Sequence, residues 1–301
     1  MEQTKLGRSA VVTAVIIALL AGFALVAAHP AQAQAKTYKG LTYEIVKGKA
    51  QISGYTGKSK SVTIPAKIKG KPVTKVSFWN QKVRAINLRK ATSLKNVDLR
   101  GLSLKKLDLS KNKKLKTLLF SGFKLGKLDL SKNKQLTQLY CYNGTLKKLN
   151  LSKNKKLKTL DCRDNKLTRL VLPKSNQLKY LVCHYNKLTK LDVSKNKQLK
   201  ELDCLHNKIA KLNVTKNKQL KTLSCGYNKL KKLNLSKNKR LQKLSCDHNK
   251  LTKLNVSKNT KLEWLNCVGN NIKALNLSHN PKLSTEDVMV DKGVSVKWAN
   301  A

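Results

Sequence analysis

Acidic and aromatic residues are scarce in this chain. Its 301 residues include 15 Asp and Glu against 64 Lys and Arg, which gives a formal net charge of +49, and only 5% are aromatic. Chains of low hydrophobicity and high net charge often fail to fold, because charge of one sign destabilises a compact state. Leucine nevertheless recurs at regular intervals, so the apolar content is concentrated in a pattern that indicates internal repeats.

The sequence also lacks the patterns that mark catalytic and metal sites. It contains no nucleophile elbow, no phosphate-binding loop and no zinc-ligand spacing, and no pair of carboxylates spaced for acid–base chemistry. His184, His206 and His248 come from different repeat units, and the last two would lie about 10 Å apart by the spacing of stacked strands. We therefore predict a protein that is not an enzyme and that has no cofactor and no metal site.

One long uncharged stretch occurs, from Ala10 to Ala28. Lys5 and Arg8 precede it, and residues 31–35 offer small residues in the A-x-A arrangement that a signal peptidase needs. The pattern predicts an export signal over residues 1–35, cut after Ala35. The alternative is an uncleaved membrane anchor, because an apolar stretch of this length can nearly span a bilayer.

The seven cysteines are spaced 21 residues apart without an insertion, and each lies in the pattern LxxLxCxxN. The other half of each unit reads LxxLxLSKN, so each coil turns twice. This is the leucine-rich-repeat signature, in which a short strand leads into an asparagine turn and the next unit stacks on it. The cysteines are Cys141, Cys162, Cys183, Cys204, Cys225, Cys246 and Cys267.

The repeats resemble those of the bacterial internalins, and among them the internalin J-like members with 21-residue repeats and a cysteine in the strand. The resemblance covers about Val83 to Asp291. It implies a β-rich solenoid, a leucine-rich-repeat superhelix with short parallel strands on its concave face. We place about ten coils in residues 83–292 and a C-terminal strand or cap in residues 293–301.

Residues 36–82 read differently, with alternating β-formers separated by Gly and Lys turns. Here "TIP" precedes "KGKPVTKV", which resembles the N-terminal segment of BspA-like leucine-rich repeats. We predict a small N-terminal β cap, because the first unit of a solenoid must shield an otherwise open core.

The cysteine position is filled by apolar residues in other coils: Phe78, Leu99 and Phe120 upstream and Val288 downstream. Free cysteine behaves as a small buried hydrophobe. Neighbouring coils about 4.8 Å apart would hold the Cβ atoms farther apart than the roughly 3.8 Å that a disulfide prefers. We predict a reduced structural ladder, with a terminal disulfide and a metal site as the alternatives.

Residues that flank the strand leucines are expected on the concave face. Lysine is absent from the positions one before, one after and two after each cysteine, which hold Tyr, His, Asp and Ser instead. Mixed aromatic and polar surfaces are typical of recognition sites, whereas simple drift in a solvent-exposed column is the alternative. The predicted concave binding residues are Tyr140, Tyr142, Tyr180, His184, Tyr185, His206, Tyr227, His248 and Trp264.

Lysines instead form columns in the second half of each unit. We predict that one column binds polyanions: Lys111, Lys132, Lys153, Lys174, Lys195, Lys216, Lys237 and Lys258. A polymer along it would relieve repulsion and release counter-ions, whereas a merely solvated, soluble surface is the alternative.

Together these patterns predict an exported adhesion or binding protein at the bacterial surface. Its expected partners are a protein or glycan on the concave face and anionic cell-wall or host polymers on the lysines, with nucleic acid bound only non-specifically. Contact with a membrane is expected only if the signal segment stays uncleaved. A polyanion-binding protein without a specific receptor is the alternative function.

Overall fold

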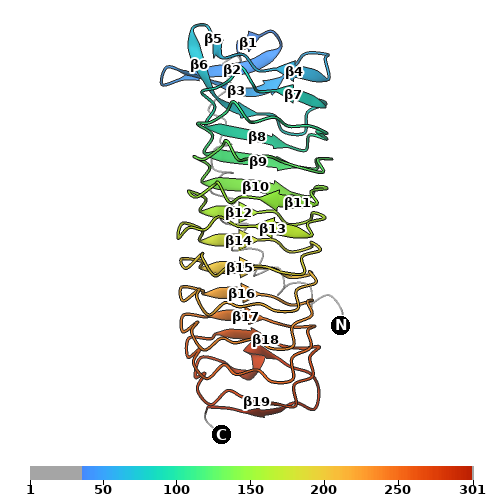
Figure 1. Ribbon diagram of the computed structural model, residues 1–301, viewed down its shortest axis with the longest axis vertical. Coiled ribbons are helices and arrows are strands. Elements are labelled where there is room, and N and C mark those ends of the chain that lie inside the picture. Colours follow the sequence, from blue (N-terminus) through green and yellow to red (C-terminus); the bar gives the residue numbers. More distant parts are fainter. Residues whose placement is uncertain (1–35, 300–301) are drawn as a thin grey trace. The chain divides into compact units, whose positions relative to one another are not determined.

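The structure, a computed structural model, describes residues 36–299. The predicted export signal lies outside these residues. Among the described residues, no helix could cross a bilayer. The residues from Tyr38 onward form a β-solenoid of about 12 turns in which the strands are stacked one coil above another (Figure 1). The predicted leucine-rich-repeat solenoid is therefore confirmed.

The strands are short, and a 3₁₀ turn, η1 (Thr285–Asp287), is the helical element found within residues 36–299. The strands are β1 (Lys36–Tyr38), β2 (Leu41–Val46), β3 (Lys49–Tyr55), β4 (Ser61–Thr63), β5 (Lys67–Ile68), β6 (Lys71–Ser77), β7 (Ala85–Asn87), β8 (Asn96–Arg100), β9 (Thr117–Ser121), β10 (Gln138–Tyr142), β11 (Lys148–Asn150), β12 (Thr159–Asp161), β13 (Arg169–Val171), β14 (Tyr180–Val182), β15 (Glu201–Asp203), β16 (Thr222–Ser224), β17 (Lys243–Ser245), β18 (Trp264–Asn266), β19 (Ala274–Asn276), β20 (Val288–Met289) and β21 (Ser295–Lys297).

The largest sheet has 15 strands and continues from the N-terminal segment into the repeats. Strands β2 and β3 form an antiparallel hairpin, and β3 pairs in parallel with β6, which pairs in parallel with β8. From β8 to β20 every neighbouring pair on this sheet is parallel, one strand per coil. The sheet offers each coil the backbone of the next as its hydrogen-bonding partner. The boundaries predicted for the two caps remain predictions.

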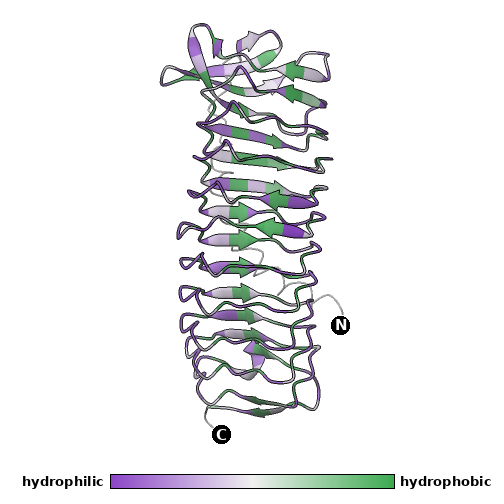
Figure 2. Cartoon of the chain, in the orientation of Figure 1, coloured by the Kyte–Doolittle hydropathy of each residue, from purple (hydrophilic) through white to green (hydrophobic). Residues whose placement is uncertain are grey.

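The core is a column of leucines that stack in register. Leu139 pairs with Leu160, and Leu160 with Leu181, and all three side chains are fully buried. Hydrophobic residues alternate with polar ones along the coils, with the hydrophilic residues gathered in the turns (Figure 2). Each fully buried leucine contributes about 1.5–3 kcal/mol, but one coil buries its leucines only when another covers it, so the fold depends on stacking.

The seven cysteines are buried and free, as the reduced-ladder prediction requires. Cys141 lies in register with Phe120, which confirms that the cysteine position is an apolar core position. Burial raises the pKa of the Cys267 thiol to about 12. These thiols are therefore protonated and unreactive at neutral pH.

The prediction for Val288 is wrong. Val288 lies opposite Leu265, and the backbone N–H of Cys267 donates to Met289. The last coil is thus shifted in register relative to the 21-residue spacing, because the 3₁₀ turn Thr285–Asp287 lengthens the chain between the two strands. Val290 packs against the core at this end of the solenoid.

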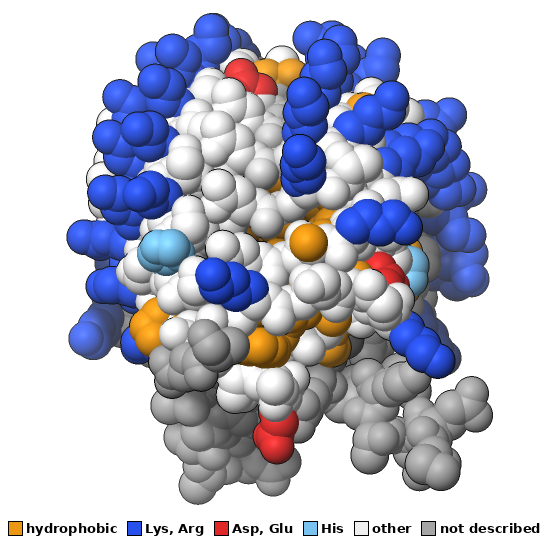
Figure 3. Space-filling view, turned by 90° about the horizontal axis from the view of Figure 1, so that it is seen from below, with side chains coloured by type: hydrophobic (Ala, Val, Ile, Leu, Met, Phe, Trp, Pro, Cys, Tyr) orange, Lys and Arg blue, Asp and Glu red, His pale blue; other side chains and the backbone are white. Residues whose placement is uncertain are grey.

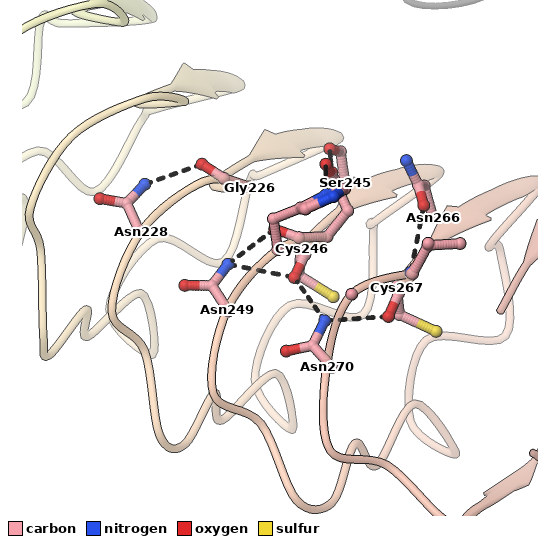
Figure 4. A network of polar contacts seen from close by, with 12 residues as sticks. Gly226, Asn228, Ser245, Cys246, Asn249, Asn266, Cys267 and Asn270 are labelled. Atoms are coloured by element: carbon pink, nitrogen blue, oxygen red, sulfur yellow. Dashed lines mark hydrogen bonds and ion pairs between the residues drawn. The ribbon is translucent and has the colours of Figure 1, made fainter. Parts of the chain in front are cut away.

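A ladder of asparagine side chains, from Asn165 to Asn270, joins the coils after the strands that carry Cys162 to Cys267 (Figure 4). The amide nitrogen of Asn249 donates to the carbonyl of Cys246, 3.1 Å away in its own coil, and to that of Cys225, 3.0 Å away in the preceding coil. Its amide oxygen accepts from the backbone N–H of Leu230 at 2.9 Å. One buried side chain thereby satisfies three backbone groups of two coils, which buried turns require.

A second asparagine ladder is fully buried in the SKN turns. Asn217 donates to the carbonyls of Val193 and Asn196, at 3.0 and 2.9 Å. In this column Ser175 replaces asparagine, and its hydroxyl has no hydrogen-bond partner. One column of the chain therefore contains both asparagines that bond to the preceding coil and a serine that makes no such bond.

Replacing Asn217 with alanine is expected to destabilise the solenoid by about 2–3 kcal/mol, because two buried carbonyls lose their donor. Ser175→Ala is the matched control and should change stability by less than about 0.5 kcal/mol. Denaturant unfolding followed by circular dichroism measures both. Equal losses in the two variants would show that the asparagine bonds contribute little.

Candidate functional site

The candidate site is the strand face, the outward surface of β8 to β18, together with the residue that turns the chain after each strand. The residues just before the cysteines point away from the core, yet most are buried. Asp161, Asp203 and Ser224 are exposed by 1%, 4% and 1%, because in-register neighbours in the coils above and below cover them. This part of the face is a tightly packed floor rather than a row of free side chains.

Two of the predicted binding residues are buried as well, Tyr140 in the floor and His184 in the column one after the cysteine. Tyr140 is 3% exposed and lies in register between Leu119 and Asp161. His184 is 8% exposed, and its Nδ1 lies 2.7 Å from a carboxylate oxygen of Asp203. Their predicted exposure to a partner is wrong, because the pattern of one coil does not show how far its neighbours reach over it.

The residues two after the cysteines form an aromatic ladder, by which we mean Tyr185, His206, Tyr227 and His248. Successive ring centroids lie 4.4, 4.1 and 4.1 Å apart, with interplanar angles of 11°, 18° and 9°. The rings are therefore stacked face to face through four coils. Tyr185 and Tyr227 are exposed by 52% and 41%.

The ladder occupies backbone positions that disfavour bulky side chains. Its four residues have φ between 48° and 51°, in the left-handed region. The same column in other coils has Asn80, Gly101, Gly122, Asn143, Asp164 and Gly269, also at positive φ. Gly, Asn and Asp adopt this conformation at low cost and His is also enriched there, whereas the bulky tyrosine is strained by about 1–3 kcal/mol. Strain of this kind points to a role that the fold alone does not require.

Stacking determines what the ladder can offer a partner. Each inner ring has both faces covered by its neighbours, so the exposed parts are ring edges with the tyrosine hydroxyls and imidazole nitrogens. Burial lowers the pKa of His206, so that imidazole is neutral at pH 7. The ladder is thus a row of hydrogen-bonding edges that contains no lysine or arginine.

The other three predicted residues lie beside the floor and are half-buried. Tyr142 ends β10, and the guanidinium of Arg163 lies 4.9 Å from its ring centroid. Tyr180 and Trp264 begin β14 and β18, in the column three before the cysteine. Tyr180 lies in register with Glu201, and Trp264 with Lys243. Tyr180 and Trp264 are separated from the ladder by the floor, whereas Tyr142 stands in the column next to the ladder.

Buried charges lie in the floor beneath this surface. Asp161 is 1% exposed, and burial raises its pKa to about 6, against the opposing charge of Arg163. The Arg163 Nε lies 3.6 Å from Asp161 Oδ2, too far for a hydrogen bond. Burial acts to lower the pKa of His184, but the hydrogen bond to Asp203 and the charges of Asp203 and Asp161 together outweigh it, and the pKa is raised. Within residues 36–299, His, Cys, Asp and Glu form no group of three that could hold a metal.

The lysines form exposed columns in the turns. We call the eight predicted polyanion-binding lysines, from Lys111 to Lys258, the first rail, and all eight are exposed. Two further rails are exposed as well: Lys106, Lys127, Lys148, Arg169, Lys190, Lys211, Lys232 and Lys253, and Lys166, Lys187, Lys208, Lys229 and Lys250. Lys and Arg side chains crowd both sides of the view in Figure 3.

Few acids offset these rails. Asp108 and Asp129 each accept a hydrogen bond from the backbone N–H of the serine two residues later, at 2.9 Å, which lowers the pKa of both carboxyls. Residues 204–246 contain no Asp or Glu at all. Two whole coils therefore present lysine without compensating charge.

Trp79 and Arg100 also belong to this face, although they are not among the predicted residues. Trp79 is 66% exposed, and Arg100 lies 5.9 Å from its ring centroid. Both stand in the column one after the cysteine position, because Trp79 precedes Tyr142 by three repeats of 21. Extending the flanking columns upstream, as was done for the core column, would have found them.

The repeat architecture is similar to that of known leucine-rich-repeat structures. No protein-family model and no curated protein sequence matches the chain. Among solved structures, it is similar to the functional domain of InlJ from Listeria monocytogenes, described as including a cysteine ladder, with 32% identity over 82% of this chain and a TM-score of 0.68. The chain is a leucine-rich-repeat protein with internalin J-like, cysteine-ladder repeats. It spans 53% of that InlJ structure.

More distant structures share the fold of this leucine-rich-repeat protein. A Leptospira interrogans leucine-rich-repeat protein matches with 22% identity, a TM-score of 0.57, and 75% of this chain and 66% of its own covered. The ectodomain of the Arabidopsis thaliana receptor kinase GASSHO1/SCHENGEN3, in complex with CASPARIAN STRIP INTEGRITY FACTOR 2, matches with 22% identity and a TM-score of 0.53, over 73% of this chain and 32% of its own. The BspA-like resemblance of residues 36–82 remains a prediction.

Proposed function

We propose that this chain is an exported, non-enzymatic binding and adhesion protein of the bacterial surface, whose strand face binds a protein or glycan. The observation that carries the proposal is the aromatic ladder. Four consecutive coils place Tyr and His at left-handed positions where neighbouring coils use Gly, Asn or Asp. Stacking offsets part of that strain, but an unstrained turn without aromatics was available to the same fold.

The composition of the surface supports the proposal. Tyr and Trp are enriched where proteins bind partners, and Lys is depleted there. The strand-face columns flanking the cysteines exclude lysine in a chain that has 64 Lys and Arg. The resemblance to InlJ and the peptide complex of a plant receptor ectodomain are consistent with a binding role.

The ladder predicts that Tyr185→Ala with Tyr227→Ala weakens adhesion to intact animal cells by about tenfold or more, the loss expected of hot-spot aromatics. Cell-bound fluorescent protein measures the effect, and treating the cells with protease or glycosidase separates a protein from a glycan receptor. Lys166→Gln with Lys187→Gln, close to the ladder in sequence, is the control and should retain adhesion. Adhesion that survives loss of both tyrosines would remove the ladder from the site.

A second candidate function is polyanion binding by the rails. It is supported by the two coils without an acid and by the exposure of every lysine of the first rail. Teichoic acid, glycosaminoglycan and extracellular DNA are the polymers of this charge that an exported bacterial protein would meet. Polymer binding of this kind weakens steeply with salt, because each neutralised anionic group releases counter-ions.

A further inference from the structure

The exposed aromatic surface of the strand face does not end at the ladder. Within residues 36–299 the large hydrophobic side chains that are exposed are Ile45, Trp79, Tyr185 and Tyr227. Three of these four stand in the two columns that follow the cysteine position. Trp79 is the most exposed of them, at 66%, and lies at the N-terminal end of the same face.

Between Trp79 and the ladder, one arrangement of three side chains occurs twice. In the first, Arg100 binds Asp98 through two hydrogen bonds, Nε to Oδ1 at 2.9 Å and Nη2 to Oδ2 at 2.7 Å, while its guanidinium lies 5.9 Å from the Trp79 ring centroid. In both arrangements an arginine pairs with the aspartate two residues earlier and lies over the aromatic residue one coil earlier. This recurrence indicates a built surface rather than a single chance contact.

The second arrangement lies three coils further along. Arg163 lies 4.9 Å from the Tyr142 ring centroid, and its Nε lies 3.6 Å from Asp161. The two arrangements lie on one column, in which Ser121 stands in register between Arg100 and Tyr142. Below them, His184 meets Tyr185 edge to face at 5.3 Å, where the ladder begins.

The choice of arginine here is informative. Lysine supplies nearly all the positive charge elsewhere, yet Arg100 and Arg163 are the basic residues in the columns one before and one after the cysteine position from Ser77 to Val268. A planar guanidinium stacks on aromatic rings and keeps directional N–H donors free, whereas lysine is a strongly hydrated point charge. Trp, Tyr and Arg are the residue types that dominate binding energy at protein interfaces.

We propose that the face from Trp79 to His248 is one protein-binding surface, whose partner offers uncharged, hydrogen-bond-accepting groups at its centre and acidic groups around it. This inference rests on the proposed function and extends it to a partner class. The two ends are eight coils apart, about 38 Å at the spacing of stacked strands. That length fits a protein interface of ordinary size, about 800 Å² on each partner.

A carbohydrate fits less well, because the inner rings of the ladder have covered faces on which no sugar can stack. The acidic surroundings of the partner follow from charge complementarity with the rails. The centre of the face is different, since Arg100 and Arg163 are each paired with an aspartate and the ladder contains no lysine or arginine. Salt should therefore alter the rate of association more than the strength of the central contacts.

A phage-displayed library of random linear dodecapeptides, selected on the purified chain in high salt, tests the proposal. Three variants are compared: Trp79→Ala with Tyr142→Ala, Tyr185→Ala with Tyr227→Ala, and Lys-to-Gln changes throughout the first rail. We expect selected peptides that lose about tenfold or more in affinity on each of the first two variants, and that bind the rail variant as they bind the native chain. Thermal unfolding confirms that each variant is folded.

Each other outcome overturns the inference. Peptides that depend on the ladder but bind the Trp79 and Tyr142 variant normally would limit the site to the ladder and leave the proposed function standing. Acidic peptides that depend on the rails, or no enrichment at all, would remove the face as a protein-binding surface. If a glycan microarray binds the chain through the same tyrosines and peptides do not, the occupant is a carbohydrate.

Discussion

Exchanging all eight lysines of the first rail for glutamine is expected to lower the affinity for heparin about 100-fold at low salt and to flatten the dependence of log affinity on log salt. The slope should fall by about one for each contacting lysine that is removed. The physical reason is crowding of charge. Lysines about 4.8 Å apart in one column repel by roughly 0.8 kcal/mol per pair in water, and a bound polyanion relieves every pair at once.

The control variant keeps the positive charge of the first rail but carries it on a different side chain. Lys-to-Arg changes at the same eight positions should preserve the salt dependence, since the counter-ions released depend on charge. Isothermal calorimetry across a salt series measures both variants, with teichoic acid in parallel. Unchanged slopes in the glutamine variant would mean that the charge serves solubility, and the polyanion function would then fail while the strand-face function stood.

Asp161→Asn is expected to raise stability above pH 7 by up to about 3 kcal/mol, which is the cost of a pKa raised from 3.8 to about 6. An acid whose pKa is raised by folding binds its proton more tightly in the folded state. The folded state therefore loses stability as the pH rises from about 4 through about 6. The Oδ2 atom of Asp161 has no hydrogen bond, so Arg163 and His184 compensate the buried charge only in part.

His184 also makes the folded state less stable as the pH rises. Its pKa is raised by the hydrogen bond to Asp203, so its contribution is full below its unfolded pKa of about 6.5 and is lost as the pH rises through the folded value. We expect the native chain to be more stable at pH 5 than at pH 7.5, and Asp161→Asn to remove most of that difference. The neutral side chain cannot stabilise the His184 imidazolium, which reduces the pH dependence further.

The matched control is Asp164→Asn, an exposed carboxylate three residues away. Denaturant unfolding at the two pH values measures the stability of all three proteins. The two variants lose the same charge, so comparing them removes the effect of the overall charge. An identical pH dependence in the native chain and Asp161→Asn would show that water reaches Asp161 and that its burial costs little.

On the strand face, the repeat pattern predicts which side chains leave the core but not which of them are exposed. The pattern of one coil assigns Tyr140, His184 and Tyr185 to one outward surface, and all three do leave the core. Tyr140 and His184 are nevertheless covered, whereas Tyr185 is exposed, because exposure depends on the side chains of the coils above and below. The same holds for Trp79, whose place on the face becomes visible only when the register is followed into the degenerate N-terminal coils.

The sequence by itself determined the solenoid, the core column of leucine and cysteine, and the absence of lysine from the columns that flank the cysteines. It could do so because a 21-residue repeat places like residues in like positions, and hydrophobic burial acts on each coil separately. Only the tertiary structure decided the stacking of Tyr185, His206, Tyr227 and His248, the shifted register at Val288, and the raised pKa of Asp161. Those features arise between coils, from distances and covering side chains that no single repeat contains.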